Sequence, residues 1–112
     1  MEEKIGGSFL IEETNYQNIF IIEDFDETSK QMIDATREFV EKEIYPNIRE
    51  LENHNYDLVK NIMKKAGELG LLGLNIPEEY GGFGMGFNLS MFICGEISAY
   101  SGSVATAYGA HT

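Results

Sequence analysis

The sequence predicts an all-α fold, in which two helices with one apolar face each precede two helices that are apolar almost all round. Three observations predict it. Apolar residues recur at helical spacing over residues 26–51 and again over residues 56–69. From Tyr80 to Thr112, Glu96 is the only formally charged side chain, which is typical of a buried segment. Glycine and proline separate the predicted helices and mark the turns between them.

The first helix is predicted to begin after Asp26, which can cap it, with Glu27 in the first turn, where negative charge is favoured. Pro46 should end or kink this helix, because proline lacks the N–H that a helix interior needs. Ile48 and Leu51 continue the apolar stripe briefly. The stripe itself consists of Met32, Ile33, Thr36, Phe39, Val40 and Ile44.

The second helix is expected from about Tyr56 to Leu69, after a polar connection at residues 53–55. One face is apolar and the other carries three lysines, which we interpret as a solvated face in preference to a phosphate site. The apolar face consists of Leu58, Val59, Ile62, Met63, Ala66 and Leu69, and the lysines are Lys60, Lys64 and Lys65.

A third helix is predicted from about Asn88, as its cap, to Tyr100, and a fourth begins near Ser103. The third helix has almost no polar face, so we expect it to be buried on all sides and Glu96 to pair with a cation from elsewhere. The sequence stops soon after the fourth helix begins. We therefore expect a domain truncated in its fourth helix, whose apolar surface is covered by chain beyond Thr112.

Composition narrows the classes of function. The formal net charge of −11, of which residues 1–55 contribute −9, argues against nucleic acid and anionic membranes as partners. The single cysteine, Cys94, excludes an internal disulfide and has apolar neighbours, so we expect a buried small side chain. We find no signal peptide, no apolar run long enough to span a membrane, and no metal-ligand cluster, and we expect a cytoplasmic protein. Residues 1–25 are interpreted as an extended arm, anchored by Phe9, Leu10 and Ile11.

The segment between the second and third helices, GELGLLGLNIPEEYGGFGMG from Gly67 to Gly86, is the most informative part of the chain. Gly70 stands where a helix would stop, because a residue without a Cβ adopts positive φ cheaply. Pro77 prevents a return to helix and favours an extended Ile76. Adjacent Glu78 and Glu79 point in different directions, so we favour a solvated turn over a paired-carboxylate site. The glycines of Gly82 to Gly86 lack the lysine and Ser/Thr of a phosphate loop.

This segment closely resembles the N-terminal signature of the acyl-CoA dehydrogenase family. The matching residues are Gly70-Leu71-Leu72-Gly73, Pro77-Glu78-Glu79 and Tyr80-Gly81-Gly82. The resemblance extends over about Phe25 to Thr112, and it implies that residues 26–112 are part of the N-terminal helical domain of such an enzyme. The arm resembles the leader of the longer, very-long-chain members.

The resemblance implies a flavoprotein with a middle β-domain and a C-terminal helical domain, FAD and the acyl thioester lying between them. In this family a glutamate base removes the α-proton and a hydride passes from the β-carbon to the flavin. The base lies in the C-terminal part, so we expect no catalytic residue before Thr112 and no activity from these 112 residues alone. The implied partners are an acyl-CoA substrate, electron-transfer flavoprotein as electron acceptor, and further copies of the chain in a dimer or tetramer.

The resemblance also assigns a pocket-lining role to the fourth helix, which closes the end of the acyl pocket in the family. We expect Ala105, Thr106 and Gly109 to line that pocket. Small residues at Ala105 and Gly109, and the match of Gly109-Ala110-His111 to the very-long-chain type, favour a long-chain acyl-CoA. The alternative, to which we give equal weight, is that small residues only let two helices approach closely.

Two other functions remain open on the sequence. An acyl-CoA oxidase or a nitroalkane-oxidising relative would share these helices, since the base and the access of oxygen are decided downstream. A non-enzymatic helical module, docking its apolar C-terminal half on a partner, would also explain the composition.

Overall fold

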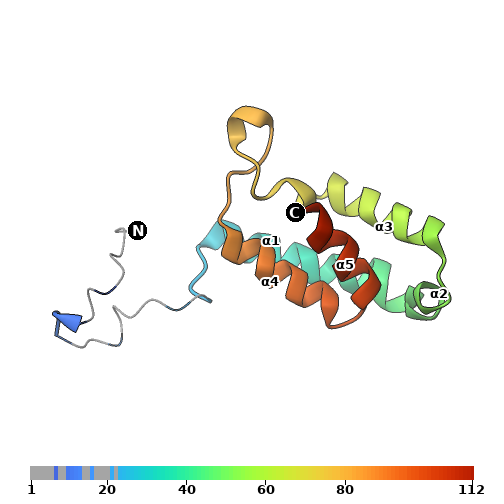
Figure 1. The fold of residues 1–112 in the computed structure, drawn as a ribbon, viewed down its shortest axis with the longest axis horizontal. Coiled ribbons are helices and arrows are strands. Elements are labelled where there is room, and N and C mark those ends of the chain that lie inside the picture. The colour runs from blue at the N-terminus through green and yellow to red at the C-terminus, as the bar shows by residue number, and fades with distance from the viewer. Residues whose placement is uncertain (1–6, 8–9, 14–15, 17–20, 22) are drawn as a thin grey trace.

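The computed structural model describes residues 7, 10–13, 16, 21 and 23–112, and every regular element of these residues is helical. Four helices form a bundle in which each runs opposite to the one before it (Figure 1). They are α1 (Glu27–Phe39), α3 (Tyr56–Glu68), α4 (Phe87–Ser98) and α5 (Gly102–His111), with the short α2 (Ile48–Glu52) between α1 and α3. The predicted all-α, up-down fold is therefore confirmed.

Pro46 bends the first helix without ending it. After α1 the chain continues through a π-helical turn, Val40–Ile44, and a 3₁₀ turn, Tyr45–Asn47, into α2. The N–H of Tyr45 donates to the carbonyl of Val40, five residues back, just before the proline that has no N–H to donate. The widened turn accommodates the proline, so both Ile44 and Leu51 remain in the core.

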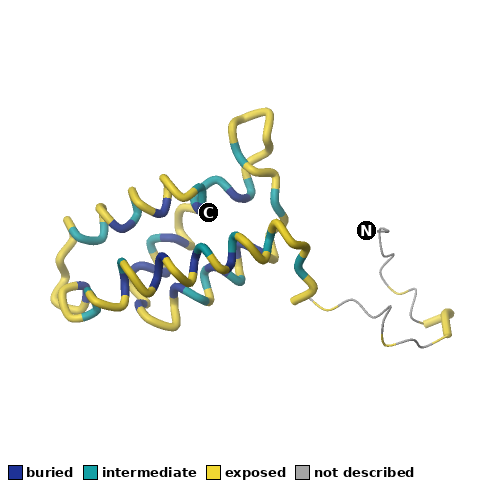
Figure 2. Tube along the Cα trace, turned by 180° about the vertical axis from the view of Figure 1, so that it is seen from behind, coloured by how far each residue is buried: buried dark blue, intermediate teal, exposed yellow. Residues whose placement is uncertain are grey.

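The core lies between the four long helices, and Figure 2 shows its buried positions on their facing sides. Each fully buried Leu or Ile contributes about 1.5–3 kcal/mol relative to an exposed one, so this core accounts for the association of the helices. Its members are Ile33, Phe39, Val40, Ile44, Leu51, Ile62, Ala66, Leu71, Leu74, Leu89, Ile93, Ile97, Val104, Ala105 and Tyr108.

Helix α5 is held at both ends by polar contacts. Ser101 caps it, since its hydroxyl accepts from the N–H of Val104 at 3.3 Å. The fully buried Tyr108 donates its hydroxyl hydrogen to the carbonyl of Leu71, 3.2 Å away in the turn that follows α3. Burial raises the pKa of the Tyr108 phenol above its ordinary value, which favours the neutral, donating form.

The predicted cation partner of Glu96 is Arg37 on α1. The Arg37 Nη2 and Nε atoms lie 2.8 and 3.2 Å from Glu96 Oε1, and the pair joins two helices 59 residues apart in sequence. The hydrogen bond to Glu96, and then its charge, hold the pKa of Arg37 above its usual value. The prediction that Glu96 is paired is confirmed.

One prediction about α4 is wrong. The helix begins at Phe87 with Gly86 as its cap residue, so Asn88 is the second helical residue rather than the cap. Within the described residues Phe87 and Met91 of α4, one turn apart, are 68% and 54% exposed. The apolar surface that the sequence predicts is present, but α1 and α5 cover only part of it.

The predicted arm lies mostly outside the described residues. Phe9 is among those not described, whereas Leu10 and Ile11 are 76% and 90% exposed. Phe25 packs on the bundle, and its ring meets that of Phe92 edge to face at 5.2 Å.

Candidate functional site

The signature segment folds into a protruding loop, which we call the signature loop and define as residues 76–85 (Figure 1). The segment that leads into this loop starts after Gly70, which follows α3 with a φ of +82° and stops the helix, as predicted. A Cβ at Gly70 would lie 2.6 Å from Cε2 of Phe83, so the glycine also lets the loop fold back over the end of α3.

The base of the signature loop is closed by backbone hydrogen bonds between its two ends. The N–H groups of Gly84 and Met85 donate to the carbonyls of Ile76 and Leu74 at 2.8 and 2.7 Å. A Cβ at Gly82 would collide with the carbonyl of Ile76, so only glycine fits there. The loop is therefore a fixed feature of the fold.

A side-chain hydrogen bond joins the same region to α4. The Ser90 hydroxyl donates to Oδ1 of Asn75 at 2.9 Å, and Ser90 is buried. The loop is thus connected to α4 by Asn75, while Leu71, which begins the same segment, is bound by Tyr108 of α5.

The three predicted pocket residues lie on two sides of α5. Ala105 is 7% exposed and faces α4, where the Cys94 thiol approaches the Ala105 carbonyl at 3.8 Å. A Cβ at Gly109 would also lie 3.8 Å from Cys94 Sγ, so both residues stand beside α4. Thr106 is exposed, and its hydroxyl donates to the carbonyl of Gly102 at 2.8 Å.

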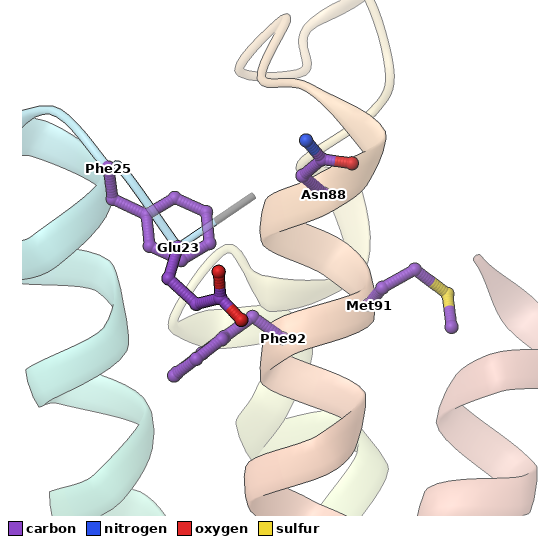
Figure 3. A pocket seen from close by; sticks show the side chains of 5 residues that line it. All are labelled: Glu23, Phe25, Asn88, Met91 and Phe92. Atoms are coloured by element: carbon purple, nitrogen blue, oxygen red, sulfur yellow. The ribbon is translucent and has the colours of Figure 1, made fainter. Parts of the chain in front are cut away.

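One small hollow lies where the chain enters α1 and passes the start of α4. It has a volume of about 200 Å³ and is lined by Glu23, Phe25, Asn88, Met91 and Phe92. In Figure 3 the rings of Phe25 and Phe92 point toward one another from the two sides, and Met91 points away around α4. The lining is mainly apolar, with Glu23 beside it.

A larger hollow, of about 470 Å³, lies between α1 and α3. Its lining includes the apolar Ala35, Phe39 and Leu69 together with charged side chains. Lys65 Nζ pairs with Glu43 Oε2 at 2.5 Å across the two helices, and Lys42 pairs with Glu38. Sequence reasoning missed this hollow, because it is built from residues that only the packing of α1 against α3 brings together.

Potential metal-ligating side chains are scattered over the described part of the chain. No group of three or more His, Cys, Asp or Glu side chains there could hold a metal ion. His54 is exposed in the turn before α3, and His111 is exposed at the end of α5. Among the described residues no helix is long and apolar enough to cross a membrane.

The fold and the signature loop together define a class: an up-down helical domain in which α4 and the loop between α3 and α4 carry uncovered apolar side chains. The family described as "Acyl-CoA dehydrogenase, N-terminal domain" matches residues 26–112. The chain therefore belongs to the acyl-CoA dehydrogenase family, through that domain. The resemblance of the signature segment to this family is confirmed.

Individual relatives agree with this assignment. The chain is 41% identical over 106 residues to a probable acyl-CoA dehydrogenase of Bacillus subtilis, covering 95% of this chain and 18% of that protein. It is 41% identical over 91 residues to the mitochondrial isovaleryl-CoA dehydrogenase of Solanum tuberosum, covering 79% and 22%. A crystal structure of an acyl-CoA dehydrogenase complexed with FAD from Bacillus anthracis superposes with a TM-score of 0.75 at 39% identity, covering 93% and 18%. The chain thus spans about a fifth of the length of these proteins.

Proposed function

We propose that the intact protein is a FAD-dependent acyl-CoA dehydrogenase that introduces a double bond between the α and β carbons of acyl-CoA thioesters, as in fatty acid β-oxidation. In this proposal α4 and α5 wall the acyl pocket, and the domain packs on the part that binds the flavin. The observation that carries it is the family match over residues 26–112, on a bundle with the same fold as a solved FAD-containing relative.

We infer that FAD binds mainly outside the described residues. The hollow of about 200 Å³ beside Phe25 is smaller than the ~300–1,000 Å³ of typical ligand pockets. The hollow between α1 and α3 is lined by three carboxylates, of Glu38, Glu43 and Glu68, and by only two lysines. This excess of negative charge disfavours binding of a pyrophosphate. We therefore assign FAD to other parts of the intact protein, and no step of the reaction to residues of this chain.

The described structure supports a wall role for α4 and α5. The two helices pack together, and Glu96, the single charge on them, is turned to Arg37 of α1. Phe87 and Met91 leave apolar surface open on α4, and on α5 the small Thr106 and Gly109, which has no side chain, are exposed. Such a surface suits the hydrocarbon part of a thioester.

We further propose a long-chain acyl-CoA as the substrate. The Bacillus subtilis relative is a longer protein than the potato enzyme, since 106 residues make 18% of the first and 91 residues make 22% of the second. The alignment of this chain with the Bacillus subtilis relative includes part of the predicted arm, residues 1–25, because its 106 residues exceed the length of the span 26–112. The potato relative is named for a short branched acyl group, so chain length has to be measured.

The proposal includes electron-transfer flavoprotein as electron acceptor and a homo-oligomeric assembly, both of which the family resemblance implies, together with a cytoplasmic location. An acyl-CoA oxidase is the rival within the same fold. It differs in passing electrons from the flavin to oxygen.

The test uses the intact protein, purified with its flavin. Anaerobic addition of acyl-CoA should bleach the flavin absorbance, and turnover should require an electron acceptor other than oxygen. Peroxide formation in air at a comparable rate would identify the oxidase instead. A flavin that no acyl-CoA of any chain length reduces would contradict both.

Chain length is tested with palmitoyl-CoA and hexanoyl-CoA. Gly109→Gln adds a long side chain beside Cys94, on the surface of α4 and α5 that we propose walls the pocket, and we expect kcat/KM for palmitoyl-CoA to fall by about tenfold or more while that for hexanoyl-CoA is kept. Ala110→Gln, on the adjacent exposed position, is the control and should change neither by more than about twofold. A wild-type preference for short acyl groups would exclude the long-chain assignment.

A further inference from the structure

Two neighbouring stripes of side chains run along α5, and each consists of residues one turn apart. The buried Val104 and Tyr108 form the first stripe, and Ala105 and Gly109 form the second, beside α4. Successive residues of an α-helix are about 100° apart around its axis, so the two stripes are adjacent. Any rotation or tilt of α5 that moves the first stripe therefore moves the second as well.

The stripe beside α4 makes only weak contacts of its own. Gly109 has no side chain, and a Cβ built there would find Cys94 Sγ at 3.8 Å. Ala105 has a single methyl group, and its carbonyl is approached at 3.8 Å by the Cys94 thiol, which is a weak donor. Because burial of apolar area holds helices together, such small residues fix the position of α5 poorly. The position of this stripe is therefore set elsewhere on α5.

Tyr108 anchors the C-terminal end of the helix. It is fully buried, and its hydroxyl donates to the carbonyl of Leu71, 37 residues earlier in the chain, at 3.2 Å. Figure 1 shows this end of α5 beside the turn after α3 that contains Leu71. A hydrogen bond depends on direction as well as distance, so this contact fixes the rotation of α5 in addition to its separation from that turn.

The Tyr108 hydroxyl is not required to fill the core. Phenylalanine would occupy nearly the same volume, and a buried hydroxyl costs free energy unless it is hydrogen-bonded. Ser90 of α4 lies within hydrogen-bonding reach of the same phenol, and the Ser90 hydroxyl donates to Asn75 Oδ1 at 2.9 Å. The phenol therefore joins α5 to α4 and to the segment after α3. The Ser101 cap at the other end of α5 joins residues three apart, which leaves the direction of the helix open.

We propose that Tyr108 is a positioning residue for the acyl chain: its hydrogen bond to Leu71 sets the distance of Gly109 from α4, and thereby the depth of the acyl pocket. This inference rests on the proposed function, because it needs α5 to wall that pocket. The tail of an acyl chain is remote from the α and β carbons, so a displaced end wall weakens substrate binding and leaves the chemical step intact. The effect belongs in KM, and only for acyl groups long enough to reach the wall.

Tyr108→Phe tests the proposal in the intact, flavin-loaded protein with straight-chain substrates from propionyl-CoA to palmitoyl-CoA. For the longest acyl group that the wild type accepts, we expect KM to rise by about fivefold or more and kcat to stay within about twofold. KM for the shortest accepted acyl group should also stay within about twofold. An unchanged KM for the longest group, an equal rise for all groups, or a fall in kcat alone would overturn the proposal.

Ser101→Ala is the matched control, because it removes the cap of the same helix and leaves the contact at the C-terminal end in place. Both variants should lower the Tm of the intact protein by a few degrees, since each loses a hydrogen bond of α5. Only Tyr108→Phe should change the dependence of KM on chain length. A change of the same size in Ser101→Ala would reduce the effect to a loosened helix and overturn the proposal.

Amide hydrogen exchange, followed by mass spectrometry, measures the anchor without catalysis. In Tyr108→Phe, peptides that cover the last turn of α5 should exchange about threefold or more faster than in the wild type, while peptides from α3 keep their rates. Unchanged exchange in that turn would overturn the anchoring. A flavin that acyl-CoA reduces, with the same chain-length dependence in both proteins, removes this inference alone. A flavin that no acyl-CoA reduces removes the proposed function and this inference with it.

Discussion

His54 occupies a backbone conformation that glycine usually takes. Its φ is +60°, and among the described residues it is the one non-glycine position with positive φ. It follows the C-cap of α2, and the N–H groups of His54 and Asn55 donate to the carbonyls of Leu51 and Glu50 at 3.1 and 3.2 Å. This is the Schellman pattern of a helix end, in which a side chain at the left-handed position costs energy.

Glycine at position 54 is therefore expected to stabilise the protein. His54→Gly removes the strain of a Cβ at positive φ, and we expect a gain of about 0.5–1 kcal/mol in the free energy of unfolding, measured by urea denaturation. Glu52→Gly, in the last turn of α2, is the control and should cost about 1 kcal/mol. A loss of stability in His54→Gly would show that the stacking of His54 on Tyr56 outweighs the backbone strain.

Asp26 makes the start of α1 sensitive to acid. The Ser29 N–H donates to Asp26 Oδ1 at 2.8 Å, and this hydrogen bond, with a second contribution from the Ser29 hydroxyl, holds the pKa of Asp26 below its ordinary value. A lowered folded-state pKa means that the stabilisation is complete above the ordinary carboxyl range of about 4 and is lost as the pH falls through the lower folded value.

The Asp26→Asn variant tests that acid sensitivity, because asparagine also caps helices but does not titrate. The Tm of the wild type should exceed or equal that of the variant at neutral pH, and the difference should shift in favour of the variant as the pH falls below about 4. Tm measured by circular dichroism from neutral to acid pH provides the comparison. Parallel curves would mean that Asp26 contributes nothing that depends on pH.

At the scale of elements, the signature loop depends on one glycine for steric reasons. Gly82→Ala would push a methyl group into the carbonyl of Ile76, so the loop must open or the variant must lose stability. We expect a cost of about 2–4 kcal/mol, in the range of severe backbone or overpacking effects. Gly95→Ala in α4, where nothing lies within 4 Å of the added methyl, should instead stabilise by about 0.5–1 kcal/mol. Equal effects of the two substitutions would contradict this account of the loop.

Local signals predicted the elements well where a local contact decides them. The cap at Asp26, the left-handed stop at Gly70 and the bend at Pro46 all depend on residues a few positions apart. The start of α4 was predicted wrongly. Asn88 has a side chain that often caps helices, but the chain before it is held in place as far as Gly86. The hydrogen bond from Met85 to Leu74 orders that segment, so the helix begins directly after it. A contact with a residue eleven positions away is not visible in a capping preference.

The candidate site was less predictable than the fold, and the reason is again distance in sequence. Ala105 and Gly109 were singled out by family resemblance, and the structure places both beside Cys94 of α4, as close packing of two helices also requires. Burial of α4 on all sides was expected from its composition, yet Phe87 and Met91 are open. Composition shows that a surface must be covered, but not which part of a longer protein covers it.

At the scale of the whole molecule, excess negative charge should make stability depend on salt. The net charge is −11, and the described ion pairs lie at the surface, where each contributes about 0–1 kcal/mol. The Debye screening length is about 30 Å in 0.01 M salt and about 3 Å in 1 M salt, so repulsion among carboxylates is felt in dilute salt and is screened in concentrated salt. We therefore expect the Tm to rise by several degrees as NaCl is raised over this range.

The double variant Glu41→Gln, Glu52→Gln removes two exposed carboxylates that form no ion pair with described residues, so its Tm should start higher and rise less. A Tm that falls with added salt would show instead that the ion pairs, above all Arg37 with Glu96, outweigh the repulsion.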